Sequence, residues 1–539
     1  MINHIVHFPK DFEPRPQQID LLQRINKAYE EGYKYVICCA PTGSGKSFIS
    51  KTLANSSREP SQNYIDLINN RTAFQQDMNG SFVAAGECED EPFFGAFALT
   101  INKNLQDQYK MLFDDSSVLK GKSNYICEVD TKYQVDTAPC LFTPGLKEKC
   151  QQCNKCPYYN ARNNALISKF GVLNYSMFLS LPDHVKRRQY LICDEASELE
   201  DELVKRFSRE LNYKTLKKLN CSFPIPTNDY SKFYLWLLEL SQNLATEINS
   251  LKSICKKNKN APISDRQRLV AYTALAISIQ TTIDTWDECE YVLEKGKDSV
   301  KITPYKVNVL SRHLFDHSER VLLLSATIID HQHFAKTLGI KSYKYIEVDS
   351  SFDPNKAPIY VSTKVRLNYK NLNASLPYIA KQIQALCDQH QNEKGIIHTH
   401  TSAITEFLLD NLKGSRFLFR LPGTDNEKIV KQHLESSENT VLVSPSLTMG
   451  VDLKDDLARF QILTKAAYLP LGDERIKKLF ENDKVWYTNK MLNNVIQACG
   501  RGVRSVDDHC VTYILDGCIT DAVMANKHKL PKYFLKRFN

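Results

Sequence analysis

The stretch Ala40-Pro-Thr-Gly-Ser-Gly-Lys-Ser47 decides the fold class of this 539-residue chain. It follows the apolar run Tyr35–Cys39, which is typical of a buried strand, and it leads into a predicted helix at residues 46 to about 54. Gly43 and Gly45 allow backbone N–H groups to turn inward around a phosphate, and the helix N-terminus adds a partial positive charge. A strand, a glycine-rich turn and a helix in this order predict a phosphate-binding loop in an α/β domain.

The side chains of this loop fit the binding of Mg²⁺ and ATP. Lys46 can reach the β- and γ-phosphates, and the hydroxyl of Ser47 can bind Mg²⁺. The predicted phosphate-binding set of the loop is Gly43, Ser44, Gly45, Lys46 and Ser47.

A second apolar strand ends in two carboxylates, which such a site also needs. The run Tyr190–Cys193 leads directly into Asp194 and Glu195. Asp194 would hold Mg²⁺ through water, and Glu195 would orient and polarise the attacking water. The two carboxylates therefore favour hydrolysis of the bound nucleotide.

Two arginines near the end of the chain supply the positive charge that phosphoryl transfer needs. Arg501 and Arg504 lie at helical spacing in the run Gln497-Ala-Cys-Gly-Arg-Gly-Val-Arg504. An arginine finger neutralises the charge that develops in the transition state, and a second lobe can deliver it on closure. The predicted catalytic side chains are Lys46, Asp194, Glu195, Arg501 and Arg504.

Composition indicates a soluble protein with several folded units. Hydrophobic residues make up 42% and charged residues 24%, which is ordinary for a globular chain of more than one domain. The net charge of +8, from 70 Lys+Arg against 62 Asp+Glu, is too mild to indicate a polyanionic partner by itself. The first residues lack a signal-peptide pattern, and no run approaches the roughly 18 apolar residues of a membrane span. We expect an intracellular, cytoplasmic protein without membrane contact.

Five of the sixteen cysteines crowd into residues 113–162, a segment with little apolar periodicity. They are Cys127, Cys140, Cys150, Cys153 and Cys156. In a reducing compartment such a group favours a metal over disulfides, and a cross-linking metal suits a segment too short to bury much core. Four thiolates accept either Zn²⁺ or an iron–sulfur cluster, and the spacing leaves both alternatives open.

Two further regions interrupt the first α/β half. Residues 55–95 are polar and lack clear periodicity, which predicts an insertion or a long loop. Residues 205–300 carry apolar residues at helical spacing, which predicts a helical insertion. A second α/β half follows, with predicted strands near 358–362, 395–398, 440–443, 460–463 and 511–515.

Taken together, the motifs resemble those of the superfamily-2 helicases, in the same order along the chain. The matching segments are Arg15-Pro-Gln-Gln18 upstream of the phosphate loop, Thr100 with Leu105-Gln106 (motif Ia), Asp194-Glu-Ala-Ser197 (the DEAH box), Ser325-Ala-Thr327 (motif III), Ser446–Asp452 (motif V) and Gln497–Arg504 (motif VI). Ser197 replaces the usual histidine of the box, which in that family helps to link the nucleotide site to motif III. We therefore expect altered coupling with retained hydrolysis.

The cysteine segment narrows the resemblance to the XPD/DinG group. The segments that carry it are Lys120–Cys127, Cys140, Cys156–Arg162 and Leu173-Asn-Tyr175. In that group a four-cysteine [4Fe–4S] domain lies between motif Ia and the box, and a helical arch lies between the box and motif III. The resemblance implies cluster ligands, for which we select Cys127, Cys140, Cys150 and Cys156. Cys150 and Cys153 compete for one place, and Cys150 is preferred because the four cysteines then remain spread along the segment.

The fold that the resemblance implies is α/β, with two RecA-like lobes, the first interrupted by a small four-cysteine metal-cluster domain and a helical arch domain. The expected division is 1–112 (lobe 1, with the insertion 55–95), 113–162 (iron–sulfur cluster domain), 163–204 (lobe 1, with the DEAH-like box), 205–300 (arch), 301–340 (lobe 1, with motif III) and 341–539 (lobe 2).

The function that the resemblance implies is ATP-dependent unwinding of DNA, with 5′-to-3′ movement on a single strand. ATP, Mg²⁺ and a [4Fe–4S] cluster would be the cofactors. The residues expected at the nucleotide, beside the phosphate loop, are Arg15, Gln18, Asp452 and Gln497. Thr100 and Thr448 are candidate contacts to DNA phosphates. The cysteine segment also combines positive charge with aromatic rings that can stack on bases, which suits a wedge at a duplex junction. The residues are Lys120, Lys122, Tyr125, Tyr158 and Tyr159.

Two alternatives remain open from the sequence. One is an RNA helicase of the same superfamily, and the other is a DNA-stimulated translocase that remodels nucleoprotein without separating strands. The expected partners are single-stranded DNA and duplex junctions, and a protein that loads the chain is not indicated. In a bacterial or phage setting we expect association with the nucleoid.

Overall fold

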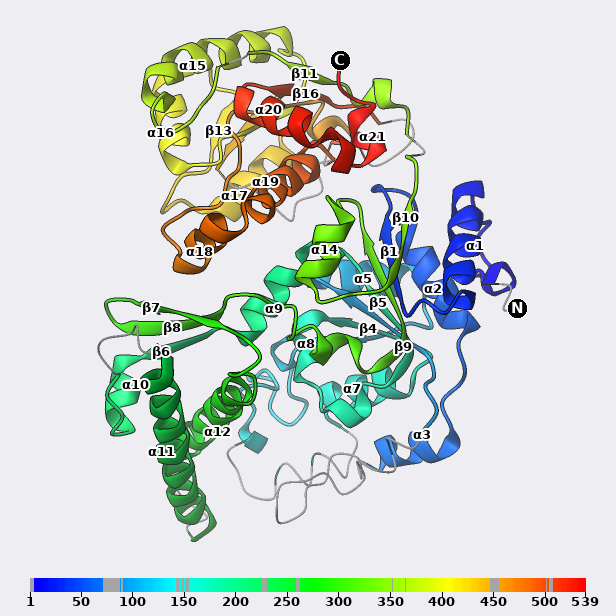
Figure 1. The fold of residues 1–539 in the computed structure, drawn as a ribbon, viewed down its shortest axis with the longest axis vertical. Helices are drawn as coiled ribbons and strands as arrows, with labels where there is room; N and C mark the ends of the chain where they lie inside the picture. The colour runs from blue at the N-terminus through cyan, green and yellow to red at the C-terminus, as the bar shows by residue number, and fades with distance from the viewer. Residues whose placement is uncertain are drawn as a thin grey trace.

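The computed structural model describes residues 4–70, 88, 91–141, 146, 150, 155–223, 230–257, 262–350, 352–363, 365–445, 455–500, 502–503 and 508–539. The chain forms two α/β lobes, with a helical projection beside the first lobe (Figure 1). Across these ranges, every helix is too short or too polar to span a membrane.

The first lobe is built on a seven-stranded parallel sheet with the order β10-β1-β9-β5-β2-β4-β3. Its strands are β1 (Tyr35–Cys39), β2 (Ala96–Thr100), β3 (Ser117–Leu119), β4 (Phe170–Asn174), β5 (Arg188–Cys193), β9 (Ser318–Ser325) and β10 (Tyr343–Glu347). Most are runs of residues buried on both faces, as expected of parallel strands with helices on either side. β9 lies between β1 and β5, so the phosphate loop and the acidic strand end are one strand apart.

Helices cover both faces of this sheet. One face carries α1 (Pro16–Glu30), α2 (Lys46–Ser56) and α5 (Lys103–Leu112). The other carries α3 (Gln62–Asn69), α7 (Pro157–Ile167), α8 (Tyr175–Ser180), α9 (Leu199–Phe207), α13 (Arg312–Phe315) and α14 (His331–Thr337). Successive side chains of a strand point to opposite faces, so Val36 of β1 packs on the face with α1, α2 and α5, and Ile37 packs on the opposite face.

Residues 205–300 form a helical projection with a small sheet beside α9 (Figure 1). Its helices are α10 (Tyr213–Lys218), α11 (Tyr230–Lys257) and α12 (Ile263–Asp284), and its antiparallel strands are β6 (Arg209–Asn212), β7 (Tyr291–Lys295) and β8 (Ser299–Pro304). The sequence predicts the helices but not the sheet. In β8 the buried Val300 and Ile302 alternate with polar neighbours, which is the two-residue period of a strand.

The second lobe has a six-stranded parallel sheet with the order β11-β16-β15-β12-β14-β13. Its strands are β11 (Ile359–Val361), β12 (Gly395–His398), β13 (Phe417–Phe419), β14 (Val441–Ser444), β15 (Phe460–Leu463) and β16 (Val511–Ile514). Its helices are α15 (Leu372–Gln389), α16 (Ser402–Asn411), α17 (Asn426–Glu435), α18 (Glu474–Asn482), α19 (Lys484–Cys499), α20 (Gly517–Asn526) and α21 (Lys532–Leu535). The five strands predicted for this half are confirmed, and β13 is an additional edge strand.

The structure differs from the sequence-based division at several boundaries. β3 joins the first sheet and α7 packs on it, so the first lobe extends into both ends of the segment 113–162. The boundaries expected at 205 and 300 fall within α9 and β8. β10 pairs in parallel with β1, so the first sheet extends past the boundary expected at residue 340. The predicted insertion 55–95 contains the helix α3, while residues 71–87 and 89–90 lie outside the described residues. The sheet boundaries differ because strands pair with segments that are distant in sequence, which an apolar pattern along the chain does not record.

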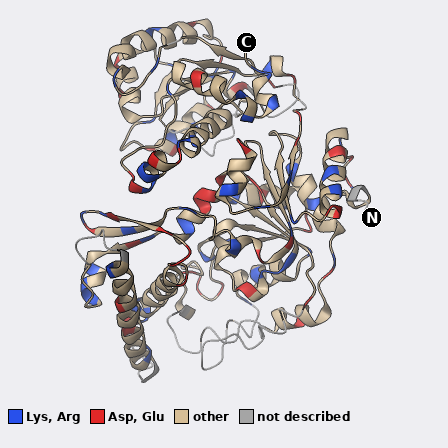
Figure 2. Cartoon of the chain, viewed as in Figure 1, with Lys and Arg blue, Asp and Glu red and all other residues tan. Residues whose placement is uncertain are grey.

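A buried charged cluster joins the two lobes. Glu200, on α9 of the first lobe, accepts from Arg475 of α18 at 2.7 Å. Its carboxylate also accepts from the indole N–H of Trp486 at 2.8 Å and lies 3.1 Å from Lys490, both on α19. Figure 2 shows residues of both charges on α9 and α18, where the lobes meet. Burial alone would raise the pKa of Glu200, but Lys490 and Arg475 lower it to about 2.

We predict that Glu200→Gln destabilises the chain by about 3–5 kcal/mol at neutral pH, because two buried cations lose their shared anion. The low pKa of the Glu200 carboxyl in the folded chain means that its stabilisation is present above the ordinary carboxyl pKa of about 4.3 and is lost as the pH falls toward 2. Urea unfolding at several pH values measures both effects. Glu435→Gln, in the exposed Lys431–Glu435 pair, is the matched control and should change stability by less than about 0.5 kcal/mol. An equal loss in both variants would contradict this role of Glu200.

Candidate active site

The phosphate loop connects the end of β1 to the first residue of α2. Gly43 and Gly45 have φ angles of 78° and 82°, in the left-handed region that favours glycine. A Cβ atom at position 45 would also collide with the side chain of Gln18. The structure therefore requires both glycines, as the sequence suggested.

Lys46 and the two carboxylates lie together at the carboxyl edge of the first sheet. The Lys46 Nζ atom is 3.8 Å from Glu195 Oε1 and donates to the carbonyl oxygen of Ala40 at 3.4 Å. Asp194 is buried, and its Oδ1 atom accepts from the backbone N–H of Glu195 at 3.0 Å. Tyr109 on α5 places its hydroxyl 3.4 Å from Asp194 Oδ2. This arrangement can bind phosphate and a divalent cation side by side.

The electrostatics of Asp194 fit a cation site. Burial and the adjacent Glu195 carboxylate raise the pKa of Asp194 to about 6, against the opposing effect of Lys46. The protein therefore provides too little positive charge to offset the cost of burying this carboxylate. A divalent cation in this position would favour its ionised form.

The predicted adenine-side residues brace the phosphate loop. Arg15 donates to the carbonyl of Gly43 at 3.1 Å, and Gln18 donates to that of Ser44 at 3.4 Å. The Gln18 side chain also accepts from the Arg15 backbone N–H at 2.9 Å, at the start of α1. Two residues that are distant from the loop in sequence thus fix its backbone.

Ser197 links the box to motif III directly. Its hydroxyl oxygen lies 3.0 Å from the Ser325 hydroxyl and 3.3 Å from that of Thr327. The Ser325 oxygen also accepts from the backbone N–H of Thr327 at 3.2 Å. The small side chain at position 197 therefore still contacts motif III, through hydroxyl groups.

The last turn of α19 reaches the box from the second lobe. Gln497, which is predicted to lie at the nucleotide, donates to Glu198 Oε1 at 2.8 Å, and Asn493 donates to the same atom at 3.3 Å. Burial raises the pKa of Glu198. Glu198 was not among the predicted site residues, although it is the next residue after the box. Four other predicted site residues lie outside the described residues: Thr448, Asp452, Arg501 and Arg504.

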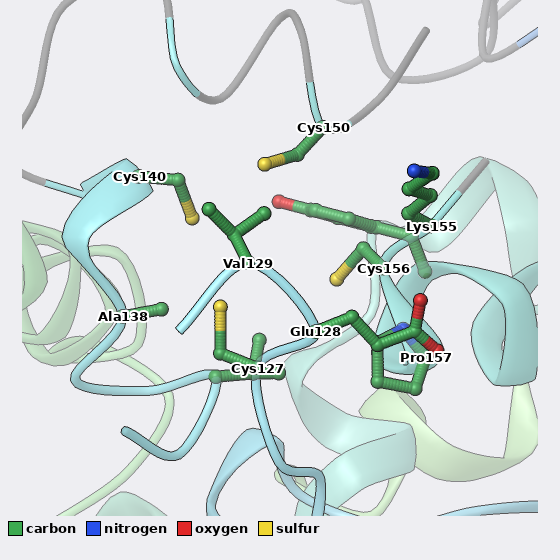
Figure 3. Close-up of a pocket in the computed structure, with 11 residues that line it drawn as sticks. Cys127, Glu128, Val129, Ala138, Cys140, Cys150, Lys155, Cys156 and Pro157 are labelled. Carbon is green, nitrogen blue, oxygen red and sulfur yellow. The ribbon is translucent and has the colours of Figure 1, made fainter. Parts of the chain in front are cut away.

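The four selected cysteines line one pocket. Cys127, Cys140, Cys150 and Cys156 come from separate turns of the chain, and their side chains face a common space (Figure 3). Apolar residues, including Val129 and Val135, line the same pocket. Within the described part of the chain, no three His, Cys, Asp or Glu residues form a ready ligand group for a single metal ion. Cys153 lies outside the described residues.

The tyrosines beside this pocket pack inward. Tyr158 is buried, edge-on to Tyr125 with 5.7 Å between ring centroids, and Tyr159 lines the cysteine pocket. The prediction that Tyr158 offers a stacking face is therefore wrong, because its ring is buried against neighbouring side chains. Lys122 lies over the Tyr158 ring at 5.4 Å, and Lys120 pairs with Asp107.

Thr100 also differs from the prediction of a DNA-contacting hydroxyl. Its side chain is fully buried, and the hydroxyl donates to the carbonyl of Asn102 at 3.1 Å. Asn102 in turn caps α5 by accepting from the N–H of Leu105. The hydroxyl of Thr100 shapes the turn after β2 and does not face solvent.

Comparison with known proteins supports this geometry. Residues 379–536 match the helicase C-terminal domain family. An XPD helicase structure superposes with a TM-score of 0.59 at 16% identity, covering 95% of this chain and 98% of the other. The structure of S. tokodaii Xpd4 gives 0.53 at 14% identity, covering 95% and 97%. The chain has the fold of the XPD helicase structures. No curated protein sequence matches it.

The XPD-like fold confirms the predicted fold class, an α/β chain with two RecA-like lobes. The family match and the shared fold support a helicase function. The contact between Gln497 and Glu198 brings the second lobe close to the edge that holds Lys46, Asp194 and Glu195.

We predict that Ser197→Ala lowers nucleic-acid-stimulated ATP turnover about tenfold, or about 1.4 kcal/mol, because the hydroxyls of Ser325 and Thr327 both lose the oxygen to which they donate. The KM for ATP should change by less than about twofold, because the phosphate loop is untouched. Steady-state kinetics at saturating single-stranded DNA measure both constants. Ser180→Ala, which removes an exposed hydroxyl on α8, is the control. Unchanged stimulated turnover in the Ser197 variant would show that the hydroxyl link carries no coupling.

Proposed function

We propose that the chain is an ATP-dependent DNA helicase that moves 5′ to 3′ on single-stranded DNA and unwinds duplexes. The observation that carries the proposal is the approach of Lys46 to Glu195 at 3.8 Å, in a chain with the XPD-like fold. The charges of these side chains suit phosphoryl transfer to water. The direction of movement rests on the resemblance alone.

The ATP site works through residues of both lobes. Lys46 binds the β- and γ-phosphates, and Glu195 orients the attacking water and accepts its proton. Ser47 and Asp194 would hold Mg²⁺, which when bound would neutralise phosphate charge. Arg501 and Arg504 of the second lobe are proposed to stabilise the transition state.

Loss of the γ-phosphate then removes contacts that hold the two lobes closed. Differential contacts of this kind are how a nucleotide shifts a two-state element. The contact between Gln497 and Glu198, three residues beyond Glu195, gives the second lobe a direct connection to the hydrolysis site. Repeated closure and opening would move the lobes along a single strand held by its phosphates.

The cysteine pocket is proposed to hold a [4Fe–4S] cluster. Four cysteine side chains that face one space fit a sulfur-ligated group, and the apolar lining would shield it. Such a group would cross-link the segment between β3 and α7, which carries all four cysteines. Residues 205–300 are proposed as the arch beside it.

We predict that the chain displaces a strand from a duplex with a 5′ single-stranded tail and leaves a 3′-tailed duplex intact. Lys46→Ala should abolish both strand displacement and ATP turnover while DNA binding persists, because the phosphates lose their main cation. Displacement from the 3′-tailed duplex alone would overturn the polarity. ATP-driven removal of a bound protein block, without strand separation, would identify a translocase, and stimulation by RNA alone would identify an RNA helicase.

We predict about four irons and four acid-labile sulfides per chain after purification without oxygen, as a [4Fe–4S] cluster requires. Cys127→Ser should lower the iron content and impair strand displacement more than ATP turnover. Cys255→Ser, on α11 away from the pocket, is the matched control and should behave as the wild type. Stoichiometric zinc would contradict the cluster and leave the ATP site unaffected.

A further inference from the structure

A tyrosine outside the proposed catalytic set holds the backbone between the two catalytic carboxylates. Tyr175 is the first residue of α8, directly after β4, and its side chain is buried. Its hydroxyl donates to the carbonyl oxygen of Asp194 at 2.8 Å. The residue belongs to the Leu173-Asn-Tyr175 segment, to which the ATPase mechanism assigns no role.

The peptide that Tyr175 holds precedes a strained residue. Glu195 has a φ of 51°, in the left-handed region that residues other than glycine rarely adopt. This φ angle describes rotation about the bond between the amide nitrogen and Cα of Glu195. Holding the carbonyl of Asp194 restrains the plane of that amide, from which the Cα atom and the side chain of Glu195 extend.

The rest of the Asp194 residue is held by separate contacts. Its N–H donates to the carbonyl of Leu99 in β2 at 2.9 Å. Its carboxylate accepts from the N–H of Glu195 and lies within 3.4 Å of the Tyr109 hydroxyl. Two hydrogen bonds therefore act on the peptide plane that leads to Glu195: Tyr175 holds its carbonyl oxygen, and the Asp194 carboxylate holds its N–H. Tyr175 is the contact that comes from another element, whereas Tyr109 acts on the carboxylate.

We propose that Tyr175 is a positioning residue for the hydrolysis of ATP. By holding the Asp194 carbonyl it keeps Glu195 in the left-handed conformation, with its carboxylate 3.8 Å from Lys46. Tyr175 touches neither nucleotide nor water in this role, and it acts only through Glu195. The inference rests on the proposed ATPase function.

The test is Tyr175→Phe, which keeps the ring in the core and removes the hydroxyl. We expect kcat for Mg-ATP at saturating single-stranded DNA to fall by about tenfold or more, because the attacking water loses its oriented base. The KM for ATP should stay within about twofold, since the phosphate loop is unchanged. Tyr29→Phe is the control: its hydroxyl is also buried in the first lobe and has no hydrogen-bond partner among the described residues. Its kcat should equal that of the wild type.

Two further measurements separate positioning from packing. In a Glu195→Gln background, Tyr175→Phe should cause no additional loss of single-turnover rate, whereas equal fold-losses in both backgrounds would overturn the inference. p-Aminophenylalanine at position 175 restores a donor and should recover kcat, and no recovery would also overturn it. A Tyr175→Phe chain that turns over ATP at the wild-type rate, or that unfolds, assigns Tyr175 to the core instead. A wild-type chain without ATP turnover would refute the proposed function itself.

Discussion

The approach of Lys46 to Glu195 depends on the parallel register of three neighbouring strands. β9 pairs with β1 on one side and with β5 on the other, so all three strands end at the same edge. That edge carries the phosphate loop, the hydroxyls of motif III and the two carboxylates. Segments separated by well over a hundred residues are therefore aligned by backbone hydrogen bonds. The cysteine segment and the helical projection interrupt the chain between these strands without interrupting the sheet.

The second lobe meets this edge through α9, which follows the box directly. Glu200 ties α9 to α18 and α19, while Gln497 reaches back to Glu198. The buried Glu200 carboxylate thus pairs with cations of both α18 and α19, and Lys490 also pairs with Asp201 of α9 at 2.9 Å. α9 also leads into the small sheet beside the helical projection. A change at the hydrolysis site can thus reach the second lobe and the projection through one helix.

Much of the fold could be predicted from local sequence, and much of the site could not. The run at 35–39 and the later strands were predictable because short apolar runs bounded by turn residues are typical of buried strands. The buried positions of Thr100 and Tyr158 depend on neighbours that are distant in sequence, so residue type alone suggested exposure. The hydrogen bonds of Ser197 could not be predicted either, because its partners in motif III are about 130 residues away. Motif spacing identified the chemistry, and the packing assigned the individual hydrogen bonds.

The most direct test of the account is the rate of Mg-ATP hydrolysis by the full chain with and without single-stranded DNA. The account predicts slow turnover of the protein alone and a saturable rise of about tenfold or more with DNA, because the strand must lie across both lobes for them to close productively. Double-stranded DNA without a single-stranded tail should stimulate far less. Absence of turnover, or a rate that is indifferent to any nucleic acid, would contradict the claim that the chain is a nucleic-acid motor.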